Sequence, residues 1–113
     1  MTDETTPILE EIESLLAAPP EGREGPSLAR IEHTLTAGYA RALALEAERW
    51  RLERRIGEVA SSLADSDTEH RTAELAALAR RKSTADVDLS RLRGRLASLR
   101  TRASTLRGLA ALL

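Results

Sequence analysis

A regular pattern of apolar residues runs through residues 28–63, which read LARIEHTLTAGYARALALEAERWRLERRIGEVASSL. The pattern steps alternately by three and four residues, and only Gly38 and Arg49 depart from apolar side chains. Its positions are 28, 31, 35, 38, 42, 45, 49, 52, 56, 59 and 63. A spacing that averages about 3.5 residues keeps one face of a helix against a partner helix. The stretch predicts a coiled-coil helix over residues 27–64.

The same spacing returns in the second half of the chain, from Leu75 to Leu113. Ser66 and Glu69 form a capping-box signature just before it, which predicts a second helix over residues 67–112. Two such helices joined by a short loop can meet only in antiparallel fashion. The sequence therefore predicts an all-α fold, a long antiparallel coiled-coil helical hairpin over residues 27–113.

A bend near Asp67 sets the register of this hairpin and places Gly38 opposite Leu96, a small residue against a large one. The same register brings Arg49 and Lys82 close together at positions of the apolar pattern. Acidic residues that could pair with these two cations are Glu53 and Asp86. Arg49 and Lys82 could extend outward to solvent, or they could set the register of the helices at some cost in stability.

Residues 1–26 differ from the rest of the chain and form an acidic N-terminal segment. Thr6 and Pro7 are suited to the start of a helix, which we expect over residues 7–18. Its apolar face would consist of Ile8, Leu9, Ile12, Leu15 and Leu16. The prolines and glycines between Pro19 and Pro26 predict a linker.

The two ends of the chain carry opposite charge, although the net charge is −1. Residues 1–25 contain seven acids and one base, whereas residues 80–113 contain nine bases and two acids. A helix of about three turns is unstable alone in water, so the N-terminal helix must dock. We expect Ile8, Leu9 and Ile12 to dock on the end of the second long helix, with the glutamates facing its arginines. The expected docking residues there are Leu109, Leu112 and Leu113, and the expected arginines are Arg100, Arg102 and Arg107.

Two further surfaces lie outside the apolar pattern. Tyr39, Leu43 and Trp50 form a second apolar stripe on the first long helix and include both aromatic residues of the protein. The second long helix carries a row of small side chains: Ser90, Gly94, Ala97, Thr101, Ser104 and Gly108. Glycine in a helix costs about 1 kcal/mol relative to alanine, which favours a close approach by another helix. These surfaces predict a homo-oligomer, with a dimer favoured, that forms a helical bundle and binds a protein partner through a helix face.

Composition and length limit the function classes. The chain has one Trp, one Tyr and no Phe or Cys among 113 residues, so a wide core, a disulfide framework and a thiolate metal site are excluded. We expect a cytoplasmic protein without a signal peptide or a membrane-spanning segment.

Catalytic and cofactor motifs are absent from the sequence. His33 and His70 are the only imidazoles, and the hairpin would hold them far apart, so we expect no metal site. The sequence has no glycine-rich phosphate loop, and no histidine and acid are positioned to activate a serine or threonine. We expect a non-enzymatic scaffold or adaptor protein without a cofactor.

An alternative function is electrostatic binding of nucleic acid or of the transcription machinery. The arginine-rich second helix could contact phosphates, although no row of aromatic residues accompanies the charge, which disfavours nucleic acid. Asp65, Asp67 and Glu69 would lie at the hairpin tip. An acidic-tipped antiparallel coiled coil resembles in outline the finger of transcript-cleavage factors that enter the RNA polymerase secondary channel. The globular domain of that family has no counterpart here.

Overall fold

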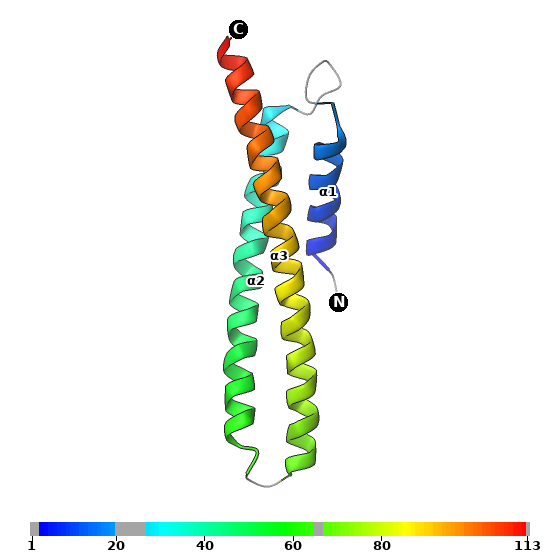
Figure 1. Ribbon diagram of the computed structural model, residues 1–113, viewed down its shortest axis with the longest axis vertical. Helices are drawn as coiled ribbons and strands as arrows, with labels where there is room; N and C mark the ends of the chain where they lie inside the picture. Colours follow the sequence, from blue (N-terminus) through cyan, green and yellow to red (C-terminus); the bar gives the residue numbers. More distant parts are fainter. Residues whose placement is uncertain (1–2, 20–26, 65–66, 113) are drawn as a thin grey trace. The chain divides into compact units, whose positions relative to one another are not determined.

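The computed structural model describes residues 3–19, 27–64 and 67–112. Within these ranges the chain forms three helices and no strand (Figure 1). The helices are α1 (Thr5–Ala17), α2 (Leu28–Ser61) and α3 (Thr68–Leu112). The predicted all-α fold is confirmed, and each helix begins and ends within three residues of the predicted bounds.

The chain divides into two compact units. Unit 1 consists of Met1–Ala42 together with Ser90–Leu113, and unit 2 consists of Leu43–Leu89. Unit 1 therefore contains α1, the first part of α2 and the last part of α3. The rest of α2 and α3 belongs to unit 2.

The core of unit 1 takes side chains from all three helices. Leu9, Ile12 and Leu15 of α1 are buried, and Ile12 has no exposed surface. The long helices contribute the other buried apolar residues of this unit, which are Ile31, Leu35, Ala42, Leu92, Leu96, Leu99 and Ala103. Four of them, Ile31, Leu92, Leu99 and Ala103, also have no exposed surface. A pair of helices leaves each member largely solvated, so the third helix accounts for this depth of burial.

The core of unit 2 is thinner and comes from α2 and α3 alone. Leu52, Val59, Leu78 and Ala85 form one buried cluster, against which Ile56 and Leu75 pack while remaining partly exposed. An ion pair flanks this cluster, with Arg55 Nη2 2.7 Å from Glu74 Oε1. The apolar pattern of the sequence thus forms the contacts between the helices in this unit.

Different side chains begin the first two helices. The Asp3 carboxylate accepts hydrogen bonds from the backbone N–H groups of Thr5, at 3.0 Å, and Thr6, at 3.4 Å. Thr6 lies inside α1 and donates its hydroxyl to Asp3, so the expectation that Thr6 begins this helix is wrong. At the start of α2, Ser27 Oγ accepts a hydrogen bond from Arg30 N at 3.2 Å, as a capping serine does.

The connection between α2 and α3 ends on a residue with left-handed backbone geometry. Asp67 has φ of 62°, a region that residues other than Gly, Asn and Asp rarely adopt. Its carbonyl accepts from Arg71 N at 3.1 Å, and the Thr68 hydroxyl donates to Leu63 O at 3.0 Å. Ser66, the predicted cap of this helix, lies outside the described residues.

Candidate functional site

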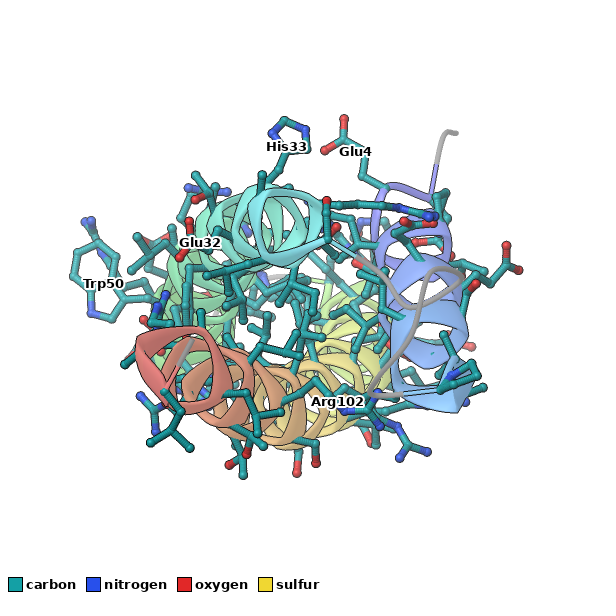
Figure 2. All side chains as sticks on the ribbon, turned by 90° about the horizontal axis from the view of Figure 1, so that it is seen from above. Glu4, Glu32, His33, Trp50 and Arg102 are labelled. Atoms are coloured by element: carbon teal, nitrogen blue, oxygen red, sulfur yellow. The ribbon has the colours of Figure 1, made fainter. Side chains whose placement is uncertain are left out.

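The apolar stripe on α2 is exposed. Tyr39 is 40% exposed in unit 1, and Leu43 and Trp50 are 66% and 57% exposed in unit 2. Trp50 projects outward from α2 (Figure 2). The Arg54 guanidinium lies 4.9 Å from the centroid of the Trp50 ring, a cation–π distance. Trp50 therefore meets a cation of its own helix while most of its apolar surface stays in solvent.

The row of small residues on α3 is also exposed, and all six members lie in unit 1. A Cβ atom added at Gly94 or Gly108 would meet no atom within 4 Å. The described part of the chain therefore supplies no neighbour that requires glycine at these positions. From the sequence, we expected these glycines to permit the close approach of a further helix. Such a helix would have to belong to another molecule.

The N-terminal helix α1 docks within its own chain. Of the three residues expected to dock, Leu9 and Ile12 are buried and Ile8 is half-buried. At the expected receiving end, however, Leu109 and Leu112 remain 37% and 83% exposed, and Leu113 lies outside the described residues. Five arginines make polar contacts with α1 and the residues at its ends, and of these five Arg102 alone was expected: Arg30, Arg41, Arg91, Arg95 and Arg102.

Arg102 holds the C-terminal end of α1, and Figure 2 shows it reaching from α3 toward that helix. Its guanidinium donates to the carbonyl oxygens of Leu16 at 2.8 Å, Ala18 at 3.0 Å and Leu15 at 3.4 Å. The last carbonyls of a helix have no partner inside the helix and carry partial negative charge, so a cation stabilises them. Sequence reasoning expected Arg102 to face a glutamate and missed this role.

Arg41 holds the other end of α1. Its Nε donates to the buried Thr5 hydroxyl at 2.8 Å, and its Nη1 lies 3.5 Å from a Glu4 carboxylate oxygen. The sequence did not indicate this contact, because Arg41 lies between Tyr39 and Leu43 and no regular spacing marks it. The signal present in the sequence was the hydroxyl of Thr5 and the carboxylate of Glu4 at the start of α1, both of which can pair with an arginine.

Ion pairs flank the buried face of α1. Glu11 Oε1 lies 2.7 Å from Arg30 Nη2, and Glu13 Oε1 lies 3.5 Å from Arg95 Nε and 3.9 Å from Arg91 Nη2. The prediction that glutamates of this helix face arginines is therefore correct in kind but not in its choice of arginines. Arg107, one of those expected, pairs instead with Glu32 of α2 at 2.6 Å. No ion pair with α1 is found for Arg100 in the described part of the chain.

The four charged residues that the register brings together, Arg49, Glu53, Lys82 and Asp86, form a charged layer in unit 2. Lys82 Nζ lies 2.9 Å from Asp86 Oδ2 and 3.8 Å from Glu53 Oε1. Arg49 lies 3.6 Å from Asp86 and 4.0 Å from Glu53. The hydrogen bond from Lys82, with the charges of Lys82 and Arg49, lowers the pKa of Asp86. The four charges neutralise one another where the pattern would otherwise place apolar side chains.

The acidic tip and the histidines, which the sequence also singled out, lie at the surface where the structure describes them. Asp67 and Glu69 of the predicted acidic tip are exposed, and Asp65 lies outside the described ranges. His33 projects outward from α2 (Figure 2). No group of three or more His, Asp or Glu side chains is arranged to hold a metal ion in the part of the chain that the structure describes. None of the described helices is both long and apolar enough to cross a membrane.

Comparisons with known proteins give no relative. No family model matches the chain, and no curated protein or solved structure matches it either.

Proposed function

We propose that this protein is a non-enzymatic helical scaffold or adaptor that self-associates and offers a helix surface to a protein partner. The observation that carries the proposal is the exposure of Leu43 and Trp50 on α2. Trp50 is the one tryptophan of the chain. Large aromatic side chains are enriched at protein interfaces, where they contribute much of the binding energy. The proposal places the protein in the cytoplasm, a location in keeping with its lack of cysteine.

The proposed architecture is one antiparallel coiled-coil hairpin formed by α2 and α3. Contacts within each unit support it. In unit 2, Arg49 pairs with Asp86 and Arg55 with Glu74, so partners move backward along α3 as α2 advances. In unit 1, Gly38 lies against Leu96, whereas the earlier residue Glu32 pairs with the later residue Arg107.

The proposed dimer is a four-helix arrangement in which two hairpins pair through their outward faces. The apolar stripe on α2, with Leu43 and Trp50, would supply the anchors. The row of small residues on α3 would supply a groove that permits close approach of a helix. Open space beside Gly94 and Gly108 supports this role, because glycine costs about 1 kcal/mol in a helix and nothing described in unit 1 requires it.

The pairing of the arginines favours the scaffold over the electrostatic alternative. Arg91 and Arg95 pair with Glu13, and Arg107 pairs with Glu32. Arg102 is engaged with backbone carbonyls. Phosphate binding by this face would have to compete with these contacts, which weakens the case for a nucleic-acid interface.

Sedimentation of the Trp50→Ala chain tests the proposal. The wild-type chain should sediment as a dimer at micromolar concentration, and Trp50→Ala should shift it toward monomer without loss of helix content. Val87→Ala on α3 is the matched control, since Val87 is a comparably exposed apolar residue at 62%. Gly94→Ala should also weaken the dimer. An unchanged mass for Trp50→Ala would contradict the proposed interface.

Salt dependence separates the two functions. Binding of a protein partner through apolar surface should change little between low and high salt. Affinity for nucleic acid through the arginines should fall steeply as salt rises. Binding releases counterions from the nucleic acid, and this release becomes less favourable as the salt concentration increases. Tight, salt-sensitive binding of a DNA or RNA duplex would favour the alternative.

A further inference from the structure

The N-terminal helix occupies a groove of defined chemistry on unit 1. Its buried residues are Thr5, Leu9, Ile12 and Leu15, which share one face of a short helix. Five arginines surround that face: Arg30 and Arg41 on α2, and Arg91, Arg95 and Arg102 on α3. We name the surface of α2 and α3 that α1 covers the α1 groove.

We propose that the α1 groove is a binding site for an acidic amphipathic helix of a partner protein, and that α1 is its releasable internal occupant. The inference rests on the proposed adaptor function, but not on self-association through Trp50. It assigns a second interaction surface to the chain and names the chemistry of the helix that the surface accepts.

The contacts of α1 show what the groove recognises. Leu9, Ile12 and Leu15 are spaced by three residues and supply the apolar face. Glu11 and Glu13 stand on its two flanks and meet arginines of different helices. An occupant therefore needs three apolar residues on one face and acids beside them. This is the usual recognition of an amphipathic helix in a groove, with basic flanks that select acidic sequences.

The two ends of the groove set the length of the occupant. Arg102 binds backbone carbonyls of Leu15, Leu16 and Ala18, groups that any helix presents where it ends. Arg41 binds Thr5 and Glu4 at the beginning of the helix. The groove therefore fits a helix of 13 residues, the length of α1, whatever its remaining side chains are.

The nature of these contacts makes α1 releasable. A fully buried Ile or Leu contributes about 1.5–3 kcal/mol, and α1 buries only three such residues. The flanking acids and arginines keep about half of their side-chain surface in solvent, at 39–56% exposure, and ion pairs open to solvent contribute about 0–1 kcal/mol each. A helix of 13 residues gains little from its own backbone, so it persists by docking. Segments with so few buried contacts open before the rest of a fold.

Release of α1 would leave an apolar surface bordered by five cations without their present partners. Such a surface attracts an acidic helix, because the charges of the two are complementary. While α1 is docked, it competes with any partner for the groove. The apparent affinity for the partner is therefore the intrinsic affinity multiplied by the fraction of chains in which the groove is open. The contact of α1 is therefore autoinhibitory.

The test uses a fluorescein-labelled peptide with the sequence of residues 3–19 as the probe, and fluorescence anisotropy as the readout. Ile12→Asp in the full chain places a charge at a fully buried position of α1 and should keep that helix out of the groove. We expect the Ile12→Asp chain to bind the peptide at least about tenfold more tightly than the wild-type chain. A peptide carrying Glu11→Arg and Glu13→Arg is the matched control and should bind more weakly.

Equal binding of the peptide by both chains, or no binding by a folded Ile12→Asp chain, would overturn the inference. Equal binding of the two peptides would overturn the assigned partner chemistry. Should Ile12→Asp disturb the fold, hydrogen exchange of the wild-type chain gives a second test. Backbone amides of residues 9–17 should exchange faster than those of residues 31–41 and 91–103, and equal protection would contradict release.

Arg102→Ala removes the clamp that the groove offers to the last carbonyls of its occupant. Added to the Ile12→Asp chain, it should weaken binding of the peptide, and Arg102→Lys should lie between Arg102→Ala and arginine because lysine cannot bridge several carbonyls. All of these measurements are independent of dimer mass. Failure of the α1 groove is therefore distinguishable from failure of the proposed self-association, which the Trp50→Ala sedimentation reports.

Discussion

Gly38 of α2 lies directly against Leu96 of α3, so that a Cβ atom at Gly38 would overlap Cδ2 of Leu96 and stand 3.4 Å from its Cγ. Leu96 is only 2% exposed, so its side chain has little room to move. Gly57, in contrast, has no atom within 4 Å of an added Cβ. The two glycines of α2 therefore have different roles.

Replacing each of these glycines by alanine should have opposite effects on stability. Gly57→Ala should raise the free energy of unfolding by about 1 kcal/mol, because alanine is the better helix former. Gly38→Ala gains the same propensity but overpacks the core, which costs about 1–3 kcal/mol, so we expect a net loss of about 1 kcal/mol. Urea unfolding followed by circular dichroism measures both. A stabilised Gly38→Ala chain would show that the two helices do not approach closely here.

A double-mutant cycle checks the assignment of the overlap to Leu96. Leu96→Ala alone should cost about 2–5 kcal/mol, because it leaves a cavity. When Gly38→Ala is added to it, the methyl group has room, and the combined loss should be smaller than the sum of the single losses. Strict additivity would place the overlap elsewhere.

The charged layer should lower stability relative to an apolar pair. Replacing Arg49 and Lys82 together by leucine restores the apolar pattern, and Glu53 and Asp86 keep contact with solvent at 48% and 38% exposure. We expect the double variant to raise the free energy of unfolding by about 1 kcal/mol. The control is Arg80→Leu, which changes an exposed arginine of α3 outside the layer. A double variant less stable than wild type would indicate that the ion pairs outweigh the apolar gain.

The pKa of Asp86 predicts a dependence of stability on pH. Hydrogen bonding to Lys82 lowers this pKa in the folded chain below its ordinary value of 3.8. The resulting stabilisation is complete above the unfolded pKa and is lost as pH falls through the folded pKa. The difference in unfolding free energy between wild type and Asp86→Asn should therefore be constant above about pH 5 and shrink below about pH 4. Asp88→Asn, two residues along α3, is the matched control; a difference that grows on acidification would contradict the assignment.

Asp67 offers a test of the turn before α3. Its φ of 62° costs an L residue about 1 kcal/mol, whereas glycine adopts it freely. Asp67→Gly should raise the thermal midpoint, and Asp67→Val should lower it, because a β-branched side chain fits this geometry worst. The backbone hydrogen bond from Arg71 N remains available to both variants. Equal midpoints would mean that the turn relaxes to another conformation.

The candidate surfaces were partly predictable. Trp50 and Leu43 could be placed on an exposed face because they fall off the apolar pattern, and the charged layer could be found because Arg49 and Lys82 fall on it. Binding by these surfaces and the continuous antiparallel coiled coil stay predictions. The surface on which α1 docks was predicted wrongly, since Leu109 and Leu112 remain exposed. Burial of Ile12 needs an apolar surface, but the sequence does not specify which one.

The sequence by itself determined the three helices and the contact of Gly38 with Leu96. Both follow from local backbone preference and from an apolar period that the chain repeats many times. One position that departs from the period, such as Arg49, therefore does not change the prediction. Only the tertiary structure decided where α1 lies and that Arg102 binds its last carbonyls. The position of a short helix at the end of a linker depends on a few long-range contacts of similar strength. The carbonyls that Arg102 binds belong to the backbone, so the pattern of side chains in the sequence does not reveal them.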